Sequence, residues 1–113
     1  TIRKIYKDCG YVIDTHTSVA ATVYKKYTEE TGDTAKTVIA STASPYKFAK
    51  NVLGSIAPEA VSNDEFETVK ELSKLTGTEV PKPLAELENA EVRFTTTCAA
   101  DEMKDVVLKA LDI

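Results

Sequence analysis

The sequence is poor in several residue types that define whole classes of protein. Its 113 residues include no tryptophan, one histidine and two cysteines. Two cysteines cannot build the disulfide framework of a small secreted scaffold, so Cys9 and Cys98 are predicted to be reduced and largely buried thiols, with a disulfide between them the less favoured alternative. The single histidine has no paired cysteines nearby, which leaves zinc too few ligands.

Positive charge and long apolar runs are also scarce. Lys and Arg number 14 against 18 Asp and Glu, for a formal net charge of −4. The basic side chains are scattered among acidic ones, so a nucleic-acid partner is not expected. No segment approaches the roughly 20 apolar residues of a membrane span, and no apolar run follows the first charged residues as in a signal peptide. We therefore expect a cytoplasmic protein without a membrane partner.

Two familiar catalytic signatures are missing as well. The chain has no Gly-x-Ser-x-Gly pattern, which argues against a serine hydrolase. With only four glycines it has no phosphate-binding loop of the Walker or Rossmann type. The first residue is Thr1, and Ile2, Ile5 and Tyr6 recur at helical spacing, so we interpret the chain as a piece of something longer.

The apolar periodicity predicts an α/β fold in which two short strands are packed with about five helices. The strands are expected at 37–41 and 92–96, and the first lacks clean alternation, as in a parallel sheet buried on both faces. The helices are expected over residues 2–9, about 16–31, about 45–57, from 62 or 63 to 76, and from 100 or 101 onward. The second helix is predicted to bury Val19, Val23, Tyr24 and Tyr27, and the last to bury Met103, Val106, Val107, Ala110 and Leu111.

Chemistry is concentrated where the first predicted strand gives way to a helix, at Ser41-Thr42-Ala43-Ser44. The carboxyl end of a strand in an open α/β sheet faces the crevice where ligands bind. The first N–H groups of the following helix favour anions, and Lys47 lies in that first turn. The alternative is purely structural: a strand end followed by a serine N-cap and a proline. His16, at the mouth of the second helix, is open to a similar structural interpretation.

Several stretches, in order along nearly the whole chain, resemble threonine synthase. Residues 10–20, GYVIDTHTSVA, are similar to that family's GY(L/V)(I/L)DPHTAVA, and residues 38–48, VIASTASPYKF, to its VVxSTASPFKF or STAHPAKF. Shorter matches are TGDT at 31–34, VPKPL at 80–84, VRF at 92–94 and EMK at 102–104. Thr15 replaces the family's proline and Ser44 the histidine of some members. The two longer motifs together make the resemblance fairly specific.

The resemblance implies that residues 1–113 are the C-terminal part of the large domain of a pyridoxal-phosphate enzyme of fold type II, the tryptophan-synthase-β-like fold. That family converts O-phospho-L-homoserine and water to L-threonine and phosphate, a lyase step of threonine biosynthesis. Thr42 matches the threonine that contacts the pyridine nitrogen, and Ser41 and Ala43 flank it. Four further residues are candidates for the active-site cleft: Asp14, His16, Thr17 and Lys47.

The same resemblance places the Schiff-base lysine and the phosphate loop of the cofactor in an N-terminal part that this chain lacks. The chain alone is therefore expected to be inactive, to need that part as its partner, and to self-associate through an exposed sheet or helix face. Two alternatives remain open: a free-standing small α/β interaction or regulatory module without catalysis, or a fragment of another fold type II lyase such as a threonine dehydratase or cysteine synthase relative.

Overall fold

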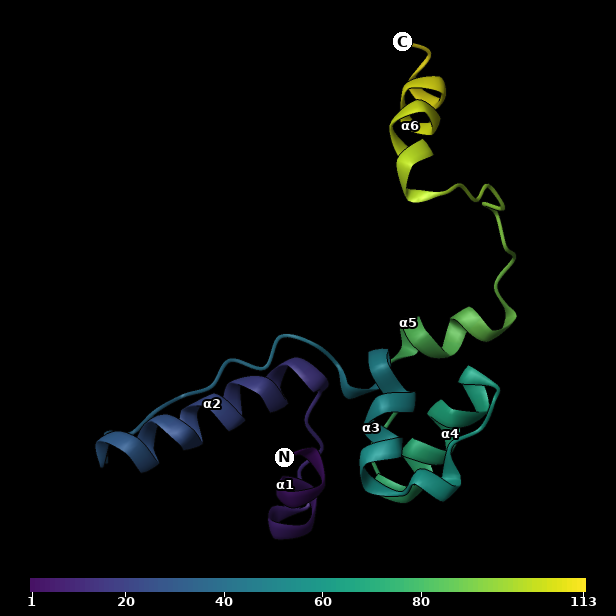
Figure 1. Cartoon of the computed structure of the whole chain (residues 1–113). Helices are drawn as coiled ribbons and strands as arrows, with labels where there is room; N and C mark the ends of the chain where they lie inside the picture. The colour runs from purple at the N-terminus through teal and green to yellow at the C-terminus, as the bar shows by residue number, and fades with distance from the viewer.

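A computed structural model describes all of residues 1–113, of which 64% are helical, and it contains no strand. It consists of six α-helices and four short 3₁₀ turns, which are named η. Figure 1 labels the α-helices. In chain order the elements are α1 (Ile2–Cys9), α2 (Thr15–Thr31), η1 (Pro45–Phe48), α3 (Ala49–Ile56), η2 (Pro58–Ala60), α4 (Glu65–Thr76), α5 (Lys82–Ala85), η3 (Glu86–Asn89), η4 (Ala100–Glu102) and α6 (Met103–Leu111).

Local capping signals set the ends of the first helices. α1, α2 and α4 each end at a glycine, Gly10, Gly32 and Gly77, whose φ angles of 70°, 69° and 67° lie in the left-handed region that glycine adopts without strain. α2 begins at Asp14 and α4 at Asp64, whose carboxylates accept backbone N–H groups of the first turn. The predicted helices over 2–9, about 16–31, and from 62 or 63 to 76 are confirmed within three residues.

The core lies where α3 packs against α1 and α4. Val52 and Leu53 of α3 and Leu72 of α4 are completely buried. The remaining buried apolar residues come from α1, the α1–α2 connection, η1 and the start of α3: Ile2, Val12, Ile13, Tyr46 and Ala49. Residues 41–48, the stretch singled out in the sequence, directly precede α3 in the chain and are fixed to this small core by Tyr46.

The predicted α/β class is wrong. Residues 37–41 run back beside α2, and residues 92–96 lie in the extended connection to α6 (Figure 1). Neither segment takes part in a backbone hydrogen bond, and Val38 and Phe94 are 94% and 85% exposed. β-branched and aromatic side chains favour a strand only where another strand and a packed face receive them. The chain brings no such neighbour to either segment.

Three predictions of burial are also wrong. Val19, Val23 and Tyr27 on α2 are exposed, because no other element covers that face of the helix. The predicted inner face of α6 is open too, with Met103 and Leu111 exposed. The cysteines are free thiols, but both are exposed, since Cys9 ends a peripheral helix and Cys98 lies in the extended connection. The apolar periodicity of α2 and α6 therefore indicates helix faces that could be buried but that no other part of this chain covers.

The molecule is elongated, because α2 extends to one side of the core and α6 stands away from it on an extended connection (Figure 1). Its radius of gyration is 18.8 Å and its principal extents are 57 × 34 × 23 Å. No helix combines the length and the apolar character that crossing a bilayer requires.

Candidate functional site

A buried carboxylate at the start of α2 organises the candidate site. Asp14 is fully inaccessible to solvent, and its Oδ1 accepts the backbone N–H groups of His16 at 2.8 Å and Thr17 at 3.3 Å. Aspartate suits this position because its short side chain satisfies N–H groups that have no partner inside the helix. One oxygen of Asp14 is thus used as a helix cap, which leaves Oδ2 for other partners.

Those other partners are two hydroxyl groups. Thr17, itself buried, donates its hydroxyl to Asp14 Oδ2 in a short hydrogen bond, and the Ser41 hydroxyl donates to the same oxygen at 3.3 Å. The Thr17 and Ser41 oxygens lie 2.9 Å apart, so the three side chains form a closed triangle. The triangle joins the start of α2 to a residue 27 positions further along the chain.

The hydrogen bonds to Asp14 determine its charge. Burial alone raises the pKa of this carboxyl, but the Thr17 hydroxyl, the backbone N–H groups of His16 and Thr17, and the His16 ring outweigh burial and lower the pKa from 3.8 to about 2. The carboxylate is therefore ionised at neutral pH and acts only as an acceptor.

His16 and Lys47 lie at the solvent side of the same cluster. The His16 Nδ1 is 3.3 Å from Asp14 Oδ1, and its side chain is 69% exposed. Its ring packs on Phe48 with centroids 5.2 Å apart and a tilt of 56°. The Lys47 ammonium is 5.9 Å from the centroid of the same Phe48 ring, a cation–π distance. Phe48 therefore brings the two polar side chains to one surface.

Thr42 and Ala43 form a short span between two anchored residues. Ser41 is held by the triangle, and Ser44 caps η1 by accepting the Tyr46 N–H at 3.3 Å. Thr42 is exposed, whereas Ala43 is half-buried. The side-chain hydrogen bonds of residues 41–44 are made by Ser41 and Ser44, and the Thr42 hydroxyl makes none within the chain. The hydroxyl of Thr42 is thus free to bind a ligand.

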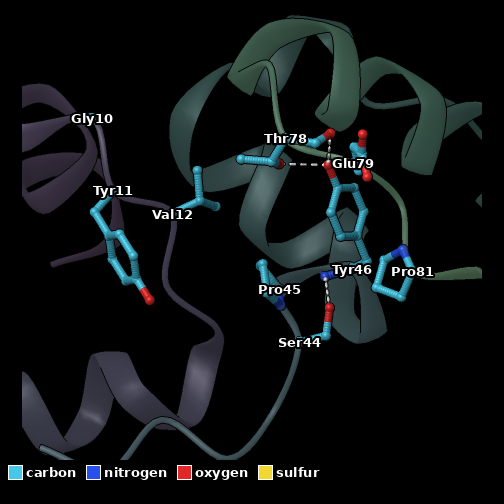
Figure 2. Close-up of a pocket in the computed structure, with 9 residues that line it drawn as sticks. All are labelled: Gly10, Tyr11, Val12, Ser44, Pro45, Tyr46, Thr78, Glu79 and Pro81. Atoms are coloured by element: carbon cyan, nitrogen blue, oxygen red, sulfur yellow. Dashed lines mark hydrogen bonds between the residues drawn. The ribbon is translucent and has the colours of Figure 1, made fainter.

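A neighbouring pocket was not predicted from the sequence. Its volume is about 280 Å³, and it is lined by Gly10, Tyr11, Val12, Ser44, Pro45, Tyr46, Thr78, Glu79 and Pro81 (Figure 2). The buried Tyr46 hydroxyl donates to the Thr78 carbonyl at 2.7 Å and lies 2.6 Å from the Thr78 hydroxyl. This pair fastens η1 to the turn after α4. The only sequence signal for this contact was the position of Tyr46, between the N-cap Ser44 and the apolar face of α3.

The structure thus brings Asp14, His16, Thr17 and Ser41 together, whereas Lys47 is connected to them only through the Phe48 ring, which the His16 ring also contacts. It contains no group of three His, Cys, Asp or Glu side chains arranged to hold a metal ion. A model of the family described as threonine synthase, C-terminal, matches residues 17–107 of the chain. The chain belongs to the threonine synthase C-terminal family. The resemblance found in the sequence is therefore confirmed.

As a member of the threonine synthase family, the chain carries most of its candidate site inside the matched region. Thr17, Ser41, Thr42 and Lys47 lie within residues 17–107, whereas Asp14 and His16 directly precede it. Neither the curated proteins nor the solved structures contain a match to the chain. Chemically, the site offers the free hydroxyl of Thr42 next to Ser41, whose own hydroxyl binds the buried carboxylate of Asp14. The ammonium of Lys47 and the imidazole of His16 are exposed beside Phe48.

Proposed function

We propose that this chain is the C-terminal part of a pyridoxal-phosphate-dependent threonine synthase, a lyase that converts O-phospho-L-homoserine and water to L-threonine and phosphate. The observation that carries the proposal is the family match over residues 17–107, which includes the Ser41-Thr42-Ala43-Ser44 stretch. The free Thr42 hydroxyl in that stretch supports it. When bound, pyridoxal phosphate supplies an electron sink for the β,γ-replacement.

The residues present fit one edge of that cofactor. A pyridine nitrogen needs a hydrogen-bond donor, and Thr42 has an exposed hydroxyl that takes no part in the hydrogen bonds of Ser41 and Ser44 around it. A neutral hydroxyl, unlike a carboxylate, leaves the ring nitrogen unprotonated. We assign Thr42 to the ring nitrogen, with Ser41 and Ala43 shaping the backbone on either side. The lysine and the phosphate loop belong to the N-terminal part that the resemblance implies.

The open side of the cluster suits an anionic substrate. Lys47 carries a positive charge, and the exposed His16 ring offers a second donor beside it. O-phosphohomoserine carries a phosphate and a carboxylate, both of which cationic and N–H donors bind. We therefore propose that His16 and Lys47 bind the anionic groups of the substrate.

We further propose that the chain alone is inactive and that its partner is the N-terminal part of the enzyme in the cytoplasm. Apolar side chains that this chain leaves exposed, including Val19, Val23, Val38 and Phe94, support a covering partner. Without that partner the same surface favours self-association. Two free thiols fit a reducing compartment.

The decisive experiment measures cofactor absorbance and phosphate release from O-phosphohomoserine for this chain, for the N-terminal part, and for their mixture. We expect both signals only in the mixture. A stable monomer whose mixture shows neither signal would refute the proposal and favour a non-catalytic interaction module. Release of phosphate by the mixture without formation of threonine would favour a lyase of another specificity.

Thr42 is tested in the complete enzyme by Thr42→Val, which removes the hydroxyl and keeps the shape. We expect weaker cofactor binding by about fivefold, the value of one ordinary hydrogen bond. Thr37→Val is the matched control, because Thr37 is exposed and its hydroxyl bonds only to the nearby Ala35 carbonyl. Unchanged cofactor binding and turnover in Thr42→Val would remove Thr42 from the site.

A further inference from the structure

The segment that carries Thr42 is held by side chains rather than by its backbone. Residues 33–43 take part in no backbone–backbone hydrogen bond. Within 38–43, Ser41 is the only residue whose side chain is hydrogen-bonded. On the far side, Ser44 and Tyr46 fix the chain to the helical core. The position of Thr42 therefore depends on two anchors, and the anchor on its N-terminal side is Ser41.

We propose that Asp14 is a positioning residue which, through Thr17 and Ser41, holds the Thr42 hydroxyl at the ring nitrogen of the cofactor. The inference rests on the function proposed above and assigns Asp14 a role that the family resemblance does not give it. Asp14 is completely buried within this chain, so its carboxylate is not exposed to a ligand and acts through its neighbours. It acts on the residue whose Cα is one peptide unit, about 3.8 Å, from that of Thr42.

The charge of Asp14 matters for this role as well as its shape. An ionised carboxylate has no proton to donate, so Oδ2 can only accept, and the hydroxyls of Thr17 and Ser41 are the donors within reach of it. The depressed pKa of Asp14 keeps it ionised throughout the neutral range. In Asp14→Asn, one oxygen still caps α2, because asparagine is as good an N-cap as aspartate. The other oxygen becomes an NH₂ donor, which cannot accept from either hydroxyl.

The test uses the complete enzyme and two forms of the cofactor: pyridoxal phosphate, and an analogue in which C–H replaces the ring nitrogen. The dissociation constant of each is measured by absorbance titration of the cofactor-free enzyme. Only the natural cofactor can use the Thr42 hydroxyl, so the parent enzyme should prefer it by about fivefold. A variant that merely loses stability weakens both forms equally and keeps the preference.

We expect Asp14→Asn and Ser41→Ala each to reduce the preference to about onefold, mainly by weakening the natural cofactor about fivefold. The double variant should lose no more than either single variant, because both changes break the same connection. The matched control is Asp64→Asn, which makes the same substitution at the N-cap of α4, where the carboxylate accepts only the Glu67 N–H at 2.9 Å. It should keep the fivefold preference.

Three outcomes overturn the inference, and they are distinguishable. If Thr42→Val loses the preference while Asp14→Asn and Ser41→Ala keep it, Thr42 is not positioned by Asp14, and the proposed function stands. If Thr42→Val keeps the preference, the assignment of Thr42 fails and the inference fails with it. If the parent enzyme releases no phosphate from O-phosphohomoserine, the proposed function itself fails. Should Asp14→Asn not fold, Ser41→Ala decides alone, because Ser41 lies outside the core.

Discussion

Replacing Asp14 with asparagine should remove stability only in the pH range where the carboxyl is ionised. The pKa of Asp14 is lowered from 3.8 to about 2, because its hydrogen bonds outweigh its burial. A group with a depressed folded-state pKa stabilises the fold above its unfolded-state pKa. That stability is lost as the pH falls through the folded-state pKa. The contribution should therefore be complete above about pH 5, and it should decline between about pH 4 and pH 2.

The size of the effect follows from the same shift. A difference of nearly two pKa units corresponds to about 2.4 kcal/mol. Because the His16 side chain that contacts Asp14 is 69% exposed, solvent screening reduces this to about 1–2 kcal/mol at neutral pH. Asparagine still accepts the backbone N–H groups of His16 and Thr17, so the loss should come from the charge of the carboxylate and from its hydroxyl hydrogen bonds.

The assay is denaturant unfolding of the parent chain and Asp14→Asn, followed by far-UV circular dichroism, at several values between about pH 7 and pH 1.5. Other carboxyl groups titrate in the same range, but they are common to both proteins, so their contribution cancels in the difference. That difference should shrink toward zero below about pH 2. If the difference in unfolding free energy stays constant across the whole pH range, or is absent at neutral pH, the ionised Asp14 carboxylate does not stabilise the fold as argued.

Three other predictions concern the helical core and are each checked by the same unfolding assay. Leu53→Ala should lower the free energy of unfolding by about 2–5 kcal/mol, because Leu53 is fully buried in a small core. A decrease of less than about 1 kcal/mol would contradict the burial of Leu53 in that core. Tyr46→Phe should cost about 1–2 kcal/mol, because the carbonyl and hydroxyl of Thr78 lose their hydrogen bonds to the Tyr46 hydroxyl. Unchanged stability would show that these hydrogen bonds do not anchor η1. Gly77→Ala should destabilise by about 1 kcal/mol, because alanine is strained at a φ of 67°. Gly54→Ala, whose new Cβ would meet Val61 at an ordinary 3.6 Å inside α3, should be neutral or stabilising; equal effects of the two glycine changes would contradict this.

Local signals predicted the helices well, because each signal acts on residues within one turn. Gly10 and Gly77 end helices through their own left-handed backbone, and Ser44 caps the turn that Pro45 begins. Residues 37–41 were assigned wrongly for the opposite reason. A strand exists only with a neighbouring strand, and the composition of 37–41 indicates only that such a neighbour would be suitable.

In the candidate site, too, local features could be predicted from the sequence and long-range contacts could not. Ser41 and Thr42 were found from the sequence because hydroxyls before a helix can be recognised locally, and Asp14 was found through the family resemblance. Their connection could not be predicted, because the Asp14–Ser41 hydrogen bond spans 27 residues and depends on the chain running back along α2. The Tyr46–Thr78 pair spans 32 residues and was missed for the same reason.

The elongated shape has a practical consequence for any study of association by this chain. A compact domain of this length has a radius of gyration of about 13 Å, whereas this chain measures 18.8 Å. The sphere swept by a tumbling particle grows with the cube of its radius, so a single chain occupies the hydrodynamic space of a compact protein about two to three times its mass. On a sizing column a monomer would therefore elute where a compact dimer or trimer is expected, and only a method that weighs the particle directly distinguishes the two.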